Sequence, residues 1–173
     1  IGNVGVADLM ESAGLTHGGF YRHFESKDAL IAEVAQTAFV ESAQRFAESA
    51  SRAGLTGIVE MFLATAHRDT PNGGCPSVAL SADAARGDRR LQGAYGDGIG
   101  ALLATIRSTL TDAEDPEALN REAMSVLAEL VGAITIARAT AASDPDLSRE
   151  ALAAARDAIM ARHSGPTKAA EPR

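Results

Sequence analysis

The sequence lacks tryptophan, contains a single cysteine, and draws only 4% of its 173 residues from the aromatics. One thiol excludes an internal disulfide framework and a zinc site built from several cysteines. We therefore expect a chain that folds without covalent cross-links in a reducing, cytoplasmic compartment. Residues that favour strands are few beside 36 alanines. Because alanine is the best helix former, this composition disfavours an all-β fold.

An excess of basic residues is also missing. The 16 lysines and arginines face 23 acidic residues, giving a net charge of −7 at pH 7. Broad, non-specific binding to polyanions needs a basic face, which this composition does not supply, but a total charge says nothing about one small DNA-reading patch. We also find no apolar run of membrane-spanning length and no signal sequence in the first residues, so we expect no membrane partner.

No residue pattern typical of an enzyme or a metal site is present. The sequence offers no nucleophile–base constellation, and the Asn72-Gly73-Gly74 turn is too short for a phosphate-binding loop and lacks the following lysine. No histidine falls three residues after a glutamate, as a di-iron helical bundle requires. We expect a protein without catalytic activity, bound metal or cofactor.

Apolar residues recur at helical spacing between capping and turn signals. Asp115 and Asp144 each precede a proline, which is typical of an N-cap followed by the first helical residue, and Ser26 is placed to cap a further helix. The apolar stripes are Leu30, Val34 and Ala38; Leu91, Tyr95, Ile99, Leu102, Ile106 and Leu110; Met124, Leu127, Val131 and Ile134; and Leu152, Ala155 and Ile159. These patterns predict helices over 6–13, 17–24, 27–50, 56–69, 76–86, 88–111, 117–142 and 146–163.

Residues 6–24 fit two short helices joined by a glycine turn. Gly14 can adopt the left-handed conformation that a tight turn needs, and Thr16 is placed to cap the second helix. Phe20 and Phe24 are spaced i, i+4 and form the buried side of that helix. The pattern predicts a helix-turn-helix, in which the second helix enters the major groove of DNA with its N-terminal end.

The other residues of the second helix are suited to meeting DNA. Gly18 and Gly19 are small enough to let the backbone approach the duplex closely. Tyr21, His23 and Lys27 can donate hydrogen bonds to phosphates.

The run from Ala13 to Leu30, AGLTHGGFYRHFESKDAL, resembles the DNA-binding signature of TetR-family transcriptional regulators, roughly A-G-[VL]-[ST]-x-G-x-[FL]-Y-x-[HY]-F-x-[SN]-K-x-x-L. The resemblance implies an all-α fold with a helix-turn-helix DNA-binding domain over 1–45, a helical effector-binding and dimerisation domain over 46–163, and a flexible tail over 164–173. Family members carry a further helix before this pair, and Ser or Thr where this chain has Gly5. We therefore expect the DNA-binding unit within 1–45 to be incomplete, with its first helix absent.

The resemblance also implies roles for individual residues. Thr16 would cap the recognition helix and contact phosphate, while Tyr21 and His23 would hold the DNA backbone. Lys27 would meet phosphate at the N-terminus of the linker helix. The positions that face base edges are those of His17, Gly18 and Gly19, and Arg22 completes the set of DNA-binding candidates without a role that the family defines.

The helices after residue 46 indicate a ligand pocket and a dimer interface. Candidates for effector binding are Met61, Phe62, His67, Cys75, Tyr95 and Ile99, with core packing or helix capping as the alternative for several of them. Four glycines in 88–111 (Gly93, Gly96, Gly98 and Gly100) favour either close packing or a deformable element. Small residues in 117–142, together with the helix 146–163, would let two chains form a four-helix bundle.

Taken together, these features predict a ligand-responsive transcriptional regulator. It would be a repressor that binds a palindromic operator as a homodimer and is released by a small-molecule effector. The alternative is a helical homodimer that does not bind DNA and senses electrophiles or oxidants through Cys75, since a thiol at a helix N-terminus gains reactivity. A small buried residue is the other interpretation of Cys75.

Overall fold

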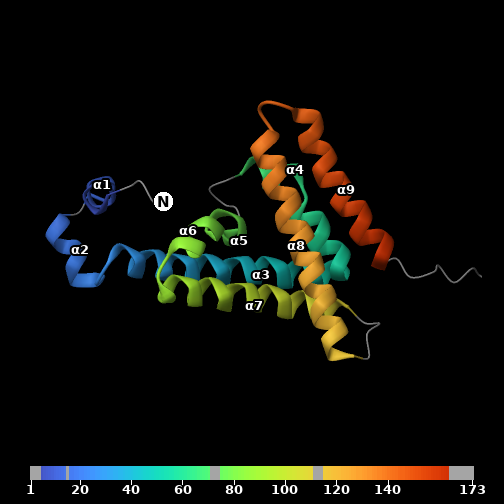
Figure 1. The fold of residues 1–173 in the computed structure, drawn as a ribbon, viewed down its shortest axis with the longest axis horizontal. Coiled ribbons are helices and arrows are strands. Elements are labelled where there is room, and N and C mark those ends of the chain that lie inside the picture. The colour runs from blue at the N-terminus through green and yellow to red at the C-terminus, as the bar shows by residue number, and fades with distance from the viewer. Residues whose placement is uncertain (1–4, 15, 71–74, 111–114, 164–173) are drawn as a thin grey trace, which may run out of the picture. The chain divides into compact units, whose positions relative to one another are not determined.

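The computed structural model describes residues 5–14, 16–70, 75–110 and 115–163, and at His17 it describes the backbone alone. All regular elements in these ranges are helices, which confirms the all-α prediction there (Figure 1). The helices are α1 (Val6–Ser12), α2 (His17–His23), α3 (Lys27–Phe62), α4 (Thr65–Asp69), α5 (Pro76–Ala79), α6 (Ser81–Arg86), α7 (Arg89–Thr109), α8 (Pro116–Thr140) and α9 (Pro145–His163). The predicted tail over 164–173 and the Asn72-Gly73-Gly74 turn lie outside the described residues.

The chain divides into two compact units. The first comprises Ile1–Arg45 and Cys75–Leu102, and the second comprises Phe46–Gly74 and Leu103–Arg173. The long helices α3 and α7 therefore contribute residues to both units. The domains 1–45 and 46–163 stay a prediction, because packing groups residues 75–102 with the N-terminal segment.

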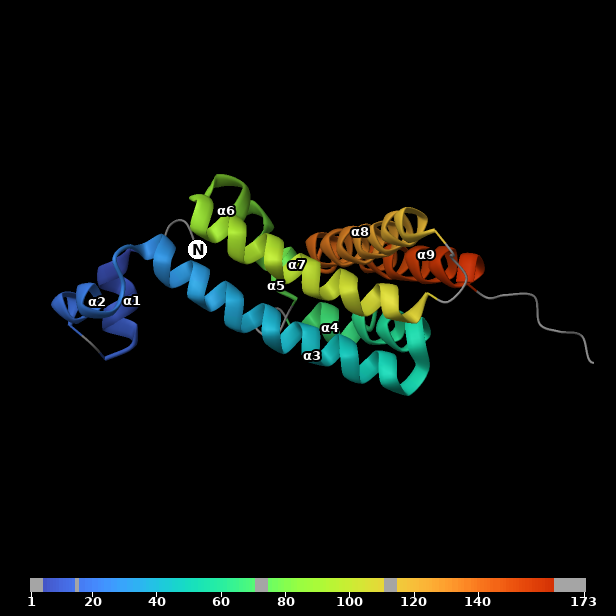
Figure 2. The same cartoon turned by 90° about the horizontal axis from the view of Figure 1, so that it is seen from below.

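The core of the first unit lies where the first half of α3 meets α5, α6 and the start of α7. Both views show the first half of α7 running beside this part of α3 (Figures 1 and 2), and α6 contributes Ala84 to the same buried cluster. The buried residues of this cluster are Ile31, Ala32, Ala35, Leu80, Ala84, Leu91 and Ala94. At its edge the ring of Tyr95 meets that of Phe39 edge-on, with centroids 5.4 Å apart.

The face of α3 that packs into this core is not the predicted one. We expected Leu30, Val34 and Ala38 to form the buried stripe, but 49% of Val34 is exposed. The buried face runs instead through Ile31 and Ala35, because α6 and α7 cover that side of the helix.

α3 changes direction between Ser49 and Gly57. Ala53 (φ −150°, ψ 25°) and Gly54 (φ 60°, ψ −142°) leave the helical conformation, which confirms the predicted break between 50 and 56. A Cβ added to Gly57 would lie 2.2 Å from the carbonyl oxygen of Ser49. Glycine at 57 therefore permits the chain to return this closely after the kink.

The single helix predicted over 56–69 is wrong, because α3 ends at Phe62 and α4 begins at Thr65. Side chains from elsewhere in the second unit bind the carbonyl groups at this break. His67 Nδ1 lies 2.6 Å from the carbonyl oxygen of Phe62, and Arg156 donates to the carbonyl of Leu63 at 3.2 Å. A helix can end where its last carbonyls find such partners.

The helix predicted over 76–86 is also divided, because α5 and α6 meet at Leu80 (φ −106°, ψ −1°). Leu80 and Ala84 both belong to the buried cluster against α3. The change of direction at Leu80 is therefore part of how this segment packs on α3.

α8 and α9 pack against each other in the second unit. The predicted caps are confirmed: Asp115 accepts from the backbone N–H groups of Glu117 and Ala118, and Asp144 accepts from that of Leu147. Buried residues line one face of α8, namely Ala123, Val126, Leu127, Leu130, Ala133, Ile134 and Ala137. Arg138 ties α4 to α8 by donating to the carbonyls of His67 at 2.7 Å and Arg68 at 3.3 Å.

One of the described helices, α8, is long and apolar enough to cross a membrane by length and composition, with a mean hydropathy of 1.4 over its best window. We expected no apolar stretch of membrane-spanning length, and by length and composition this expectation is wrong for α8. A core helix of a globular protein meets the same criterion, and one face of α8 is buried within the second unit. The stretch by itself does not indicate a membrane span.

Candidate nucleic-acid interface

α1 and α2 form a short helix pair in the first unit. Asp8 caps α1 by accepting from the backbone N–H of Gly5 at 3.0 Å. After α1 the chain turns at Gly14, whose φ of 68° confirms the predicted left-handed conformation. Met10 from α1 and Phe20 from α2 are buried. Their burial fixes the two helices together and leaves the other faces of α2 open.

Thr16 occupies the N-cap position of α2, as predicted, but its side chain makes no capping hydrogen bond. Its backbone carbonyl instead accepts from the N–H of Gly19 at 2.9 Å. The prediction that the hydroxyl caps the helix is therefore wrong for this structure. The exposed Thr16 hydroxyl keeps its donor for another acceptor.

Gly18 and Gly19 lie in the first turn of α2, after His17, whose side chain is outside the described structure. Gly18 has no positive φ, and a Cβ added to it would meet nothing within 4 Å. A Cβ on Gly19 would make ordinary contacts, 3.4 Å from Thr16 Oγ1 and 3.7 Å from Met10 Cε. Among the described residues, neither backbone conformation nor packing thus requires glycine at 18, and its small size leaves this part of α2 open to an approaching molecule.

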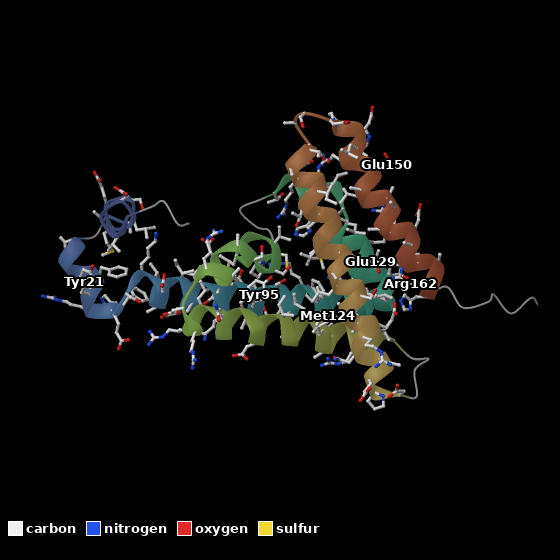
Figure 3. The ribbon with its side chains drawn as sticks, viewed as in Figure 1. Tyr21, Tyr95, Met124, Glu129, Glu150 and Arg162 are labelled. Atoms are coloured by element: carbon white, nitrogen blue, oxygen red, sulfur yellow. The ribbon has the colours of Figure 1, made fainter. Side chains whose placement is uncertain are left out.

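Tyr21, Arg22 and His23 are exposed on α2. The ring of Tyr21 packs edge-on against that of Phe20, with centroids 5.2 Å apart, while 59% of the residue remains exposed (Figure 3). Phe20 in turn packs on Phe24 at 5.4 Å, as the i, i+4 spacing predicted. The tyrosine is therefore held by the core while most of it faces solvent.

α3 begins directly after this helix pair. Ser26 caps it, as predicted, by accepting from the backbone N–H of Ala29 at 3.1 Å, and Lys27 is its first residue. The start of a long helix presents backbone N–H groups and the positive end of the helix dipole. Together with Lys27, it provides the chemistry that binds phosphate.

Arg90 is a further residue at this site and is not among the sequence-derived candidates. It donates to Glu25 at 3.1 Å from 65 positions away. No pattern in the sequence signals this contact, because only the packing of α7 on α3 brings the two residues together. The tertiary structure thus adds a cation to a segment, 1–28, that by itself holds two basic and four acidic residues.

The predicted effector residues divide between the two units. In the second unit Phe62 is buried, Met61 is half-buried, and the ring of His67 meets that of Phe62 at 4.8 Å. These contacts give Phe62 and His67 packing and helix-ending roles.

In the first unit Cys75 and Tyr95 converge on Ser77. Tyr95 donates to the carbonyl of Ser77 at 2.7 Å, and Cys75 Sγ lies 2.9 Å from Ser77 Oγ and 3.5 Å from Ser42 Oγ. Burial and, to a smaller extent, the nearby Cys75 raise the pKa of Tyr95. Ile99 is half-buried further along α7.

Two grooves in the first unit have volumes of about 330 and 590 Å³. The smaller lies along α3 beside Leu30, Val34 and Ala38, and the larger lies beside His23 and Arg90. Neither groove is lined by a predicted effector residue.

Cys75 is only 1% exposed. Because a buried thiol must wait for the structure to open, we expect it to react with a thiol probe about a hundredfold or more slowly in the folded chain than in denaturant. Absorbance of the released thiolate from a disulfide reagent measures both rates. Rapid labelling of the folded chain would contradict this expectation and favour the thiol-sensing alternative.

Residues 1–34 match the model of a family described as bacterial regulatory proteins, tetR family. The matched part of the chain, which contains α1 and α2, is thus similar to the N-terminal segment of tetR-family proteins. The match agrees with the resemblance of residues 13–30 to the signature of TetR-family transcriptional regulators.

The fold of the chain resembles that in a crystal structure of E. coli NemR in its reduced form. The two share a TM-score of 0.69 and 21% sequence identity, and the similarity covers 90% of this chain and 86% of NemR. At this identity the likeness concerns the fold. No curated protein sequence matches the chain.

Proposed function

We propose that this chain is a TetR-family repressor that binds a palindromic operator as a homodimer and leaves it when a small molecule binds. The single observation that supports DNA reading most directly is the open face of α2. On this face, no neighbouring atom of the described structure requires a glycine at position 18. Tyr21 packs on Phe20 while 59% of its surface stays exposed. Beside them, Lys27 begins α3. The site residues Thr16, His17, Gly18, Gly19, Tyr21, Arg22, His23 and Lys27 form this proposed interface.

The proposed dimer interface is the exposed face of α8 and α9, within the predicted helices 117–142 and 146–163. Met124 and Ile136 on α8 are 46% and 50% exposed, and Leu147 on α9 is 43% exposed. Between the first two lies the exposed Ala128, and a Cβ on Gly132 would meet nothing within 4 Å. Apolar and small residues on one open face suit the close approach of a second copy.

Release by an effector would act through α3. The first half of α3 carries Lys27 and packs on α5 to α7 through the buried cluster, so a shift of those helices moves the start of α3. A ligand that binds one arrangement better than the other shifts the population toward it. The chemical class of the effector stays open.

The test of this proposal is selection of bound sequences from random duplex DNA by the full chain. We expect enrichment of a palindrome with half-sites about one helical turn or a multiple apart. In the Tyr21→Phe variant the ring packing on Phe20 remains, but the proposed phosphate donor is lost. We therefore expect operator affinity to fall about tenfold, the worth of a hydrogen bond to a charged group.

Tyr95→Phe is the matched control, because it removes the other tyrosine hydroxyl of the chain at a site within the core of the first unit. We expect it to change operator affinity by less than about twofold, since no DNA contact is lost. Failure of any sequence to enrich would refute the proposed function. Equal effects of the two variants would refute the role of Tyr21.

A further inference from the structure

Arg90, in the first turn of α7, contacts the end of the helix-turn-helix segment. Its Nη2 donates to Glu25 Oε2 at 3.1 Å, and both residues belong to the same compact unit. Glu25 lies between Phe24, the C-cap residue of α2, and Ser26, which caps α3. The ion pair therefore reaches the junction of the two helices that the proposed function places on DNA.

Glu25 is electrostatically unfavourable at this junction. It is two positions from His23 and two from Lys27, which are both proposed phosphate contacts. Two residues of chain separate Cα atoms by at most about 7 Å, which is less than the Debye length of about 10 Å at 0.1 M salt, so a charge on Glu25 opposes phosphate binding at its neighbours. Its side chain is 84% exposed, so its charge acts on DNA through solvent and is weakened by salt.

Arg90 is likewise unfavourable for its own helix. Cations in the first turn oppose the helix dipole, and the first turn of α7 contains Arg89 and Arg90 but no acidic residue. The cap of this helix comes from Asp88, whose Oδ1 accepts from the N–H of Leu91 at 2.9 Å. Helix stability thus does not account for an arginine at 90, whereas the contact with Glu25 does.

We propose that Arg90 is a positioning residue of the DNA interface that acts through Glu25. Its guanidinium holds the Glu25 carboxylate and neutralises it beside the phosphate-binding residues. The neighbouring Leu91 belongs to the buried cluster on α3, so the position of Arg90 is fixed by the core. This inference rests on the proposed function and deepens it, because it gives a residue of α7 a part in DNA affinity through Glu25.

The experiment measures affinity for the selected operator by fluorescence anisotropy at several salt concentrations. We expect Arg90→Gln to weaken binding about twofold to fivefold at low salt, the range of one exposed ion pair. Arg90→Lys should restore most of the loss. In the Glu25→Gln background, adding Arg90→Gln should change affinity by less than about 1.5-fold, since the charge it offsets is gone.

Arg89→Gln is the matched control, because it removes the same charge from the same turn of α7, and Arg89 is also exposed. It should change affinity by less than about 1.5-fold, since its charge has no part in the pair. The slope of log affinity against log salt should fall by less than one in Arg90→Gln, because salt screens the exposed Glu25 charge, whereas loss of a direct phosphate contact lowers that slope by about one. Thermal unfolding midpoints of the variants should match that of the wild type.

Four results would overturn the assignment. They are unchanged operator binding by Arg90→Gln, an equal loss in Arg89→Gln and Arg90→Gln, a loss that persists in the Glu25→Gln background, and a salt slope reduced by about one. The same titrations on a random duplex separate this assignment from the proposed function. If the wild type bound the operator and the random duplex equally well, the proposed function as a sequence-specific regulator would be refuted, but the role of Arg90 would not. If Arg90→Gln bound both duplexes as tightly as the wild type, the role of Arg90 would be refuted, but the proposed function would not.

Discussion

Ala128→Arg should convert the chain to a monomer and lower its affinity for a palindromic operator by about a hundredfold or more. Ala128 lies on the exposed face of α8 that we propose as the dimer interface. An arginine there would bury an unpaired charge between two copies. Without the dimer, each half-site is bound separately and the gain from linking two sites is lost, which is worth about 10² to 10⁴ in affinity. Light scattering and anisotropy on the operator measure the two effects.

The substitution leaves the folded chain unstrained, because alanine and arginine are both strong helix formers and the site faces solvent. Ala47→Arg on α3 is the matched control, since Ala47 is also an exposed helical alanine. It should leave both the mass in solution and operator affinity unchanged. A dimer that survives Ala128→Arg would place the interface elsewhere.

Gly98→Ala should destabilise the fold by about 1–3 kcal/mol, the usual effect of overpacking a core. A Cβ at this position would lie 2.1–2.4 Å from ring atoms of Phe39, which is itself only 2% exposed. The ring must move or the helices must separate. For a chain of this size the thermal midpoint should fall by roughly 2–4 °C for each kcal/mol. Circular dichroism during heating measures it.

Gly96→Ala and Gly100→Ala are the matched controls on the same helix. A Cβ at either position would meet nothing within 4 Å, and neither glycine has a positive φ. Alanine should therefore stabilise the helix, by up to about 1 kcal/mol for each substitution. If all three substitutions shifted the midpoint in the same direction, close packing at Gly98 would not be the reason for its glycine.

The same four glycines show why the sequence left a choice open. Their spacing in α7 favoured either close packing or a deformable helix. For Gly98 the structure supports close packing, because a Cβ there would meet the ring of Phe39. Open space surrounds the other three glycines, Gly93, Gly96 and Gly100. Helical periodicity cannot reveal which side of a helix a distant ring will occupy.

The candidate site was predictable where its determinants are local. Three predicted features involve only residues a few positions apart, and the structure confirms each of them. They are the turn at Gly14, the cap at Ser26 and the i, i+4 contact of Phe20 with Phe24. The Thr16 cap was wrong because its hydroxyl makes no bond to the helix that it precedes. The contacts of the effector candidates could not be predicted, because they depend on which helix packs beside each residue.

The sequence by itself determined the helical class, the kink near Gly54 and the resemblance of the helix-turn-helix segment to the tetR family. Short-range capping, glycine conformation and a dense local motif suffice for these. Only the tertiary structure decided that Val34 is exposed, that Cys75 is buried beside Ser42, and that Arg90 reaches Glu25. These outcomes depend on contacts between residues more than 30 positions apart, or on which face of a helix its neighbours cover. The spacing of residues along the sequence does not indicate long-range contacts or which face of a helix is covered.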